Sequence, residues 1–263
     1  MPTTPDLRGH TVVALHAHPD DEAIFTGITL RRLADAGART VLVVATSGEL
    51  GGSRVPLRPG ETVARRRLAE LERAAELLGV ARLVLLGRRD SGLPGWPSSP
   101  AALAHADPAA LARRVAGVVE AEGAGTVVHD DDSGIYGHPD HRATARIGAL
   151  AVTMTGATGY RTTVDREHLH VAARGRHLVH GAARAAAVEY GRVTCEIALA
   201  VTGSAAHLER KRDAIVAHAS QVGPADVPLD GFAATYGYEW YRRDGAPGVL
   251  DRLGNAHLIA AAS

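Results

Sequence analysis

Three side chains near the N-terminus, His18, Asp20 and Asp21, bring one imidazole and two carboxylates close together in the chain. They follow an apolar, β-branched run at residues 12–15, which predicts a buried strand, and they precede a helical pattern that Pro19 suits as a first-turn residue. Open α/β sheets bind their ligands where strands end. Because side chains three apart on a helix converge, we expect His18 and Asp21 to reach one point and Asp20 to be displaced from it.

This combination suits a catalytic metal centre. Catalytic Zn²⁺ takes three protein ligands and a water, so His18 and Asp21 would supply two ligands and leave Asp20 free to accept a proton. The alternative is a structural one. Acidic residues in a first helical turn satisfy free N–H groups and complement the helix dipole, so the two aspartates would only cap the helix.

A second segment repeats the pattern. His138, Asp140 and His141 follow the apolar run at residues 126–128 and again precede a helical pattern. Two strand-to-helix loops with the same chemistry can face each other across a sheet. The sequence therefore predicts that the second loop supplies the missing metal ligand.

The two motifs, at residues 18–22 and 137–141, together resemble those of the PIG-L/LmbE family of zinc-dependent N-deacetylases. That family includes GlcNAc deacetylases of the mycothiol and antibiotic pathways. Weaker markers of the same family lie at residues 46–49, 67–71, 86–92 and 218–221, so the resemblance extends from about residue 11 to residue 221.

The motifs and the resemblance together predict that the protein hydrolyses an N-acetyl group. His18, Asp21 and His141 would hold Zn²⁺, which polarises the amide carbonyl and lowers the pKa of its water towards ~7. Asp20 would act as the general base. His138 would stabilise the oxyanion or protonate the departing amine.

Two further residues of the second loop are assigned roles. Asp140 is expected to orient His141 or His138 as an outer hydrogen-bond acceptor. Tyr136 would donate to the tetrahedral oxyanion, or only pack. The residue before this tyrosine is often glycine in the family, and Ile135 stands there in this chain. A branched side chain at that position would stiffen the loop and narrow the pocket.

The resemblance implies a GlcNAc-like sugar or sugar conjugate as the substrate, and we expect Arg67, Asp90 and Trp96 to bind it. Arg67 lies one turn from Glu70 on a predicted helix, so a surface ion pair is the alternative. Asp90 follows a predicted strand and would accept from a substrate hydroxyl or only stabilise a turn. Trp96, in an irregular loop, would stack on a sugar ring or cover an apolar patch.

The sequence predicts neither a nucleic-acid nor a membrane partner. The chain has 263 residues with 29 basic and 29 acidic side chains, so no basic surface for nucleic acid is expected. The N-terminal residues lack the layout of a signal peptide, and no apolar run approaches the ~20 residues of a membrane helix. Cys195, the single cysteine, is interpreted as a small buried hydrophobe in a strand. These features predict a cytoplasmic enzyme of unknown oligomeric state that acts on a small amide without membrane or nucleic-acid partners.

Alternating apolar runs and helical patterns predict a Rossmann-like α/β fold with a mostly parallel sheet flanked by helices. We expect one domain over residues 1–263, with a core at about 11–160 and a smaller mixed layer at about 160–263. Early strands are predicted at 12–15, 41–45, 82–86 and 126–128, and helices at 23–36, 61–78, 108–122 and 142–154. The later elements predicted are strands at 169–172 and 193–201 and a helix at 205–217.

Three alternatives stay open from the sequence. The protein would be an amidase of a mycothiol-type thiol conjugate, a metal-dependent hydrolase of another bond such as a phosphate ester, or a silent binding module on an enzyme fold. Phosphoryl transfer usually needs two metals or a cationic clamp, and the motifs show ligands for one metal. A silent module would have no need of the free Asp20.

Overall fold

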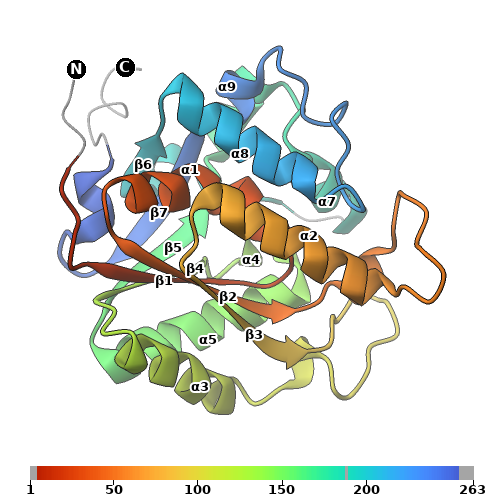
Figure 1. The fold of residues 1–263 in the computed structure, drawn as a ribbon, viewed down its shortest axis with the longest axis horizontal. Coiled ribbons are helices and arrows are strands. Elements are labelled where there is room, and N and C mark those ends of the chain that lie inside the picture. Colours follow the sequence, from red (N-terminus) through yellow and green to blue (C-terminus); the bar gives the residue numbers. More distant parts are fainter. Residues whose placement is uncertain (1–4, 187–188, 255–263) are drawn as a thin grey trace.

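One mixed sheet with the strand order β3-β2-β1-β4-β5-β7-β6 forms the centre of the molecule (Figure 1). The computed structural model describes residues 5–186 and 189–254. Strands β1 to β5 are parallel, whereas β7 runs antiparallel to β5 and β6 antiparallel to β7. The strands are β1 (Thr11–His16), β2 (Arg39–Thr46), β3 (Arg82–Arg88), β4 (Thr126–Asp130), β5 (Thr158–Thr163), β6 (Leu199–Thr202) and β7 (Tyr238–Asp244).

The order of the strands reverses at the boundary between β1 and β4. From β1 the chain crosses to β2 and β3 on one side, and β4 and β5 lie on the other side. The loops that leave the carboxyl ends of β1 and β4 therefore diverge and open a crevice, the usual ligand site of such sheets. Both His-Pro-Asp segments lie on these two loops.

Helices cover both faces of the sheet (Figure 1), with α1, α2 and α8 on one face and α3 and α5 on the other. Side chains alternate along β1 accordingly, because Val12 and Ala14 pack in one apolar cluster and Val13 and Leu15 in the other. The helices are α1 (Asp21–Asp35), α2 (Val63–Leu78), α3 (Pro108–Ala121), α4 (Gly134–Gly137), α5 (Pro139–Thr155), α6 (Arg166–His168), α7 (Leu178–Ala186), α8 (Ala205–Ala217) and α9 (Phe232–Tyr236). Short 3₁₀ helices lie at Glu49–Gly51, Leu103–His105, Thr194–Glu196 and Val249–Arg252.

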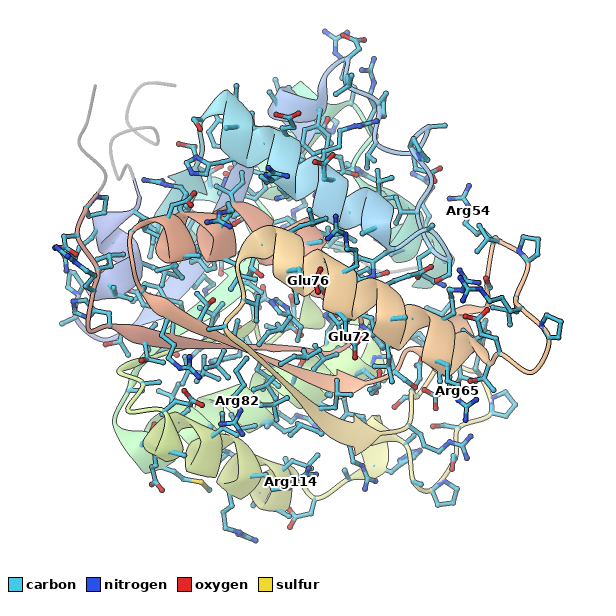
Figure 2. All side chains as sticks on the ribbon, in the orientation of Figure 1. Arg54, Arg65, Glu72, Glu76, Arg82 and Arg114 are labelled. Carbon is cyan, nitrogen blue, oxygen red and sulfur yellow. The ribbon has the colours of Figure 1, made fainter. Side chains whose placement is uncertain are left out.

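Helix α2 shows how its sequence positions one site residue. Its exposed side carries the charged side chains of Arg65, Glu72 and Glu76, which Figure 2 labels. Its buried side carries Arg67 together with Leu71 and other apolar residues. Helical periodicity thus places Arg67 among residues that face the sheet and not on the solvent side.

The predicted α/β class with a mostly parallel sheet is confirmed, and the four early strands lie where the sequence placed them. The predictions for the later part of the chain contain errors. Residues 169–172 were expected to form a strand but lie in a π-helix, Leu169–Ala173. Of the strand expected at 193–201, only its end belongs to β6. The aromatic-rich strand β7 was missed, because Gly and Pro flank it and tertiary pairing with β5 and β6 decides its conformation.

Cys195 needs a correction as well. It was interpreted as a buried strand residue, but it lies in the 3₁₀ helix Thr194–Glu196 and its side chain is exposed. In the described residues, no helix combines the length and the apolarity that crossing a bilayer requires.

A buried ion pair braces α1 against the C-terminal half of the chain. The Glu239 carboxylate accepts from the backbone N–H groups of Ile28 at 2.7 Å and Thr29 at 2.8 Å, and from Lys211 Nζ at 2.8 Å. Both charged residues are 2% exposed or less. Lys211, whose pKa burial lowers, is the only lysine in the sequence. Strand β7 and helix α8 therefore fix the position of α1, the helix that begins with Asp21.

Replacing Glu239 with alanine should destabilise the protein by about 3–5 kcal/mol, because Lys211 and two N–H groups lose their buried partner. Chemical denaturation measures this free energy of unfolding. The control is Arg73→Ala, which removes an exposed ion pair with Glu76 on α2 and should change stability by about 0.5 kcal/mol or less. Similar losses for the two variants would contradict the bracing role.

Candidate active site

The loop after β1 folds back on the first turn of α1. The backbone N–H of His18 donates to Asp21 Oδ2 at 2.8 Å, and His18 Nδ1 lies 3.6 Å from the same oxygen. His141, in the first turn of α5, reaches the other side of this carboxylate with Nε2 3.5 Å from Asp21 Oδ1. The structure thus brings the three predicted metal ligands together from two separate loops.

These three residues have the donor set of a zinc site. His18, Asp21 and His141 are all buried, and one donor atom from each lies within 4.8 Å of the others. Two imidazole nitrogens and a carboxylate oxygen are the ligand types of catalytic zinc enzymes. The residues present therefore fit the metal that the sequence predicts.

Each of the two imidazoles has an outer carboxylate partner. His18 Nε2 donates to Asp140 Oδ2 at 3.1 Å, and His141 Nδ1 donates to Asp130 Oδ2 at 3.0 Å. In the neutral form that binds a metal, such bonds fix the tautomer of each imidazole and leave its inner nitrogen, with its lone pair, facing the centre. The expectation that Asp140 orients His141 or His138 through its carboxylate is wrong, since that carboxylate contacts His18 and is held by Ser91.

Asp130 is a site residue that sequence reasoning missed. It closes β4 in a run of three aspartates, and it also accepts from Thr144 Oγ1 at 2.5 Å. Its place at the carboxyl end of a strand next to the crevice was a usable signal. Only the structure shows which aspartate of the run faces His141.

Asp20 occupies the N-cap position of α1, but its side chain makes no capping bond. Its backbone is left-handed, with φ 114° and ψ −28°, which turns the carboxylate away from the helix and towards Arg67 Nη2 at 3.2 Å. Arg67 also donates to the carbonyls of Gly48 and Pro19. The capping alternative for Asp20 therefore does not hold, and neither does the surface ion pair for Arg67.

The two adjacent aspartates differ in their electrostatics. Burial raises the pKa of Asp20 to about 6, against the opposing charge of Arg67. Burial would also raise the pKa of Asp21, but the charges of His141 and His18 lower it well below its usual range. Asp21 thus stays ionised, as a metal ligand would have to be, whereas Asp20 can exchange a proton near neutral pH.

Tyr136 and His138 face the same centre from the second loop. The Tyr136 hydroxyl donates to His141 Nε2 at 3.2 Å, and its pKa is raised well above the usual value by burial and nearby carboxylates. His138 Nδ1 accepts from the N–H of Asp140 at 3.1 Å, so its proton is on Nε2. Burial, together with the charges of His18 and His141, lowers the pKa of His138 to about 3 and keeps it neutral.

Ile135 does not act as the sequence suggested. Its side chain is fully buried in the apolar core and is not among the residues that line the pocket. It adopts φ 56° and ψ −59°, an unusual conformation for a branched residue, held by Asp131 Oδ1, which accepts from its N–H at 3.1 Å. The residue affects the backbone of the loop and not the width of the pocket.

A pocket of about 290 Å³ opens over the centre. Residues predicted to be functional line much of it, namely His18, Asp20, Arg67, Asp90, Trp96, Tyr136 and His138. The remaining lining residues, to which sequence reasoning assigned no individual role, are Leu50, Gly51, Gly92, Leu93, Ala182 and Gln221. Gln221 belongs to the weak 218–221 marker, whereas Ala182 on α7 carries no sequence signal at all.

Asp90 lies at the edge of the metal centre. Its Oδ1 accepts from the N–H of Gly92 at 2.8 Å and lies 3.7 Å from His18 Nε2. With His18 and His138 it forms a second group of buried side chains that could hold a metal ion. This group shares His18 with the first, and His18 Nε2 already donates to Asp140, so a neutral His18 serves only one of the two groups.

A family model described as GlcNAc-PI de-N-acetylase, or PIG-L, matches residues 13–152. The chain belongs to the PIG-L family. The predicted resemblance is thus confirmed, and the matched segment contains both His-Pro-Asp motifs of this PIG-L protein.

Several relatives extend over most of the chain. A protein of Thermobifida fusca named 1D-myo-inositol 2-acetamido-2-deoxy-alpha-D-glucopyranoside deacetylase is 34% identical over 247 residues, which cover 83% of this chain and 86% of the relative. A Thermobispora bispora protein of the same name is 34% identical, with 82% and 80% covered. The fold matches the N,N'-diacetylchitobiose deacetylase of Pyrococcus horikoshii with a TM-score of 0.59 at 21% identity, covering 89% of this chain and 83% of that one.

The affinity for zinc should depend on the carboxylate of Asp130 as well as on the three predicted ligands. His141→Ala should abolish stoichiometric zinc binding. Asp130→Asn should weaken it about 10- to 100-fold, because His141 loses the acceptor that fixes its tautomer. Competition with a chromophoric chelator measures both affinities. Asp20→Asn is the matched control, and a loss of zinc there as large as in His141→Ala would contradict the separation of ligand and free carboxylate.

Proposed function

We propose that this protein is a zinc-dependent hydrolase that removes the N-acetyl group of a GlcNAc-like sugar conjugate. The observation that carries the proposal is the convergence of His18, Asp21 and His141 beside the carboxylate of Asp20, with His18 and Asp20 lining a pocket. The relatives support the substrate class, since those with 34% identity are named as deacetylases of a 2-acetamido sugar linked to inositol.

His18, Asp21 and His141 would hold the zinc ion, which when bound polarises the amide carbonyl and activates a water. Asp20 takes the proton of the attacking water and returns it to the departing amine nitrogen as the amide C–N bond breaks. Its carboxylate is suited to this role because it borders the ligand Asp21 in the sequence, lines the pocket and is held by Arg67.

Two hydrogen-bond donors serve the developing oxyanion. His138 carries its proton on Nε2, the nitrogen not bonded to Asp140, and its ring lines the pocket. A neutral imidazole N–H stabilises an oxyanion without transferring its proton. Tyr136 also stays protonated and donates through its hydroxyl. That hydroxyl contacts His141 Nε2, the nitrogen that would bind the metal, so with the metal bound it would be available to donate to the substrate.

Substrate binding falls mainly to Asp90 and Trp96. Trp96 lies at the pocket rim with 51% of its surface exposed, which leaves its ring free to stack on a sugar. Asp90 lines the pocket and offers acceptor oxygens to sugar hydroxyls. Arg67 lines the same pocket and donates to Asp20 and to two backbone carbonyls, so it orients Asp20 beside the substrate.

The charges of the pocket favour an amide over a phosphate ester. Among the described lining residues the only arginine is Arg67, which is already bonded, while Asp20 and Asp90 present negative charge. A phosphate group would meet two carboxylates without a cationic clamp. The amidase of a thiol conjugate stays as the second candidate, because the two reactions share the same metal chemistry.

Acetate release tests the proposal directly. The zinc-loaded protein should release acetate from a GlcNAc–inositol conjugate, and a chelator should abolish the reaction. Asp20→Asn should lower kcat by about 10²- to 10⁴-fold with zinc content unchanged, because the general base is lost. Release of phosphate from sugar phosphates, or cleavage of only a cysteinyl thiol conjugate, would replace this function with one of the alternatives.

Asp90 should affect sugars more than simple amides. Asp90→Ala removes a buried acceptor for substrate hydroxyls, which should lower kcat/KM for the sugar about 10- to 100-fold. Turnover of a small acetamide without hydroxyls should fall much less, and zinc content should not change. Equal losses on both substrates would show that Asp90 supports the backbones of Leu50 and Gly92, which lie in two separate loops, and not the sugar.

A further inference from the structure

The backbone of Asp20, the proposed base, has a strained conformation. A φ of 114° is rare for a residue with a side chain, and the surrounding structure has to hold it in place. This conformation separates the carboxylate of Asp20 from that of its neighbour Asp21. The Arg67 guanidinium holds the side chain of Asp20, but the side chain does not by itself fix the backbone.

Glu22 holds the backbone of Asp20 through a hydrogen bond. Its Oε2 accepts from the N–H of Asp20 at 3.0 Å, and its other oxygen lies 2.6 Å from His218 Nε2. Glu22 and His218 are both fully buried. A buried carboxylate needs a partner, and His218 is the side chain that donates to this one.

His218 reaches Glu22 because it directly follows the last residue of α8, which packs on α1. The helix ends at Ala217, and the segment that follows contacts both α1 and α2. Ser220 anchors this segment to α2, since its N–H donates to Glu70 Oε1 at 2.9 Å and its hydroxyl to Glu70 Oε2 at 2.6 Å. A close approach at Gly27, where an added Cβ would lie 3.1 Å from Lys211 Cγ, lets α8 pack tightly on α1.

We infer that His218 is a positioning residue of the reaction, which acts through Glu22 to keep the backbone of Asp20 in its left-handed conformation. The inference rests on the proposed role of Asp20 as the base. Residues nearly two hundred positions apart in the chain thereby act on one carboxylate. The unbonded Nδ1 of His218 shows that this contact depends on Nε2 alone.

Metal binding is independent of this contact. The carboxylate of Asp21 is fixed by the N–H of His18, on the other side of Asp20. Loss of the His218 contact should therefore displace the base and leave the ligands in place. A structural role alone would lower stability without separating kcat from metal content.

Two amide replacements of His218 test the inference, because they differ only in reach. In His218→Gln the amide nitrogen takes the place of Nε2 and still donates to Glu22. In His218→Asn it takes the place of Nδ1 and cannot reach. We expect His218→Asn to lower kcat about 10- to 100-fold, with KM and zinc content within about twofold, and His218→Gln to restore most of kcat. A crystal structure of His218→Asn should show Asp20 outside its left-handed conformation.

Tyr160→Phe is the control for stability. It removes the bonds of a fully buried hydroxyl to Asp251 and Gly248, none of which lines the pocket. If His218→Asn lowers kcat no further than this variant at an equal loss of Tm, or if Asp20 keeps its conformation, the inference is overturned. The same holds if His218→Gln is as slow as His218→Asn. A wild-type protein that releases no acetate would instead refute the proposed function, while the crystal structure would still test the conformation.

Discussion

The carboxylate of Asp21 is the feature on which the site depends. It lies between the imidazoles of His18 and His141, which come from the loops after β1 and β4. These strands are neighbours in the sheet although more than a hundred residues separate them. The crevice at this boundary gives three buried polar side chains a common point, and burial without such partners would be unfavourable.

Two strained backbones border this point. Asp20 and Ile135 both have positive φ values, one in each of the converging loops. Each is held by a buried carboxylate that accepts from backbone N–H groups, Glu22 for Asp20 and Asp131 for Ile135. Strain of this kind persists only where neighbouring contacts over-determine the conformation. The packed C-terminal half supplies such contacts, since Arg192 contacts Asp131 as His218 contacts Glu22.

Neighbouring carboxylates thereby acquire different properties within one loop. Asp21 is surrounded by histidines and stays ionised, whereas burial beside Asp21 raises the pKa of Asp20. The two imidazoles are also set by their surroundings, because hydrogen bonds to Asp130 and Asp140 fix the tautomers of His141 and His18. The fold thus distinguishes the proposed ligand from the proposed base by environment and not by residue type.

The sequence by itself determined the parallel core, the two His-Pro-Asp loops and the three candidate ligands. These follow from local patterns: apolar runs of strand length, helical periodicity, and polar side chains placed where strands end. Arg67 was also placed near the site, although its hydrogen bonds show that it holds Asp20.

Tertiary structure decided what local patterns do not encode. Three hydrogen bonds depend on which segments meet in space. They join His18 to Asp140, His141 to Asp130 and His218 to Glu22. For His141, the sequence alone does not select Asp130 from three consecutive aspartates. The same holds for β7, whose aromatic residues favour a strand but whose partners β5 and β6 only the sheet supplies. Hydrogen bonds between distant segments form only after the sheet has brought those segments together, so no window of sequence contains both partners.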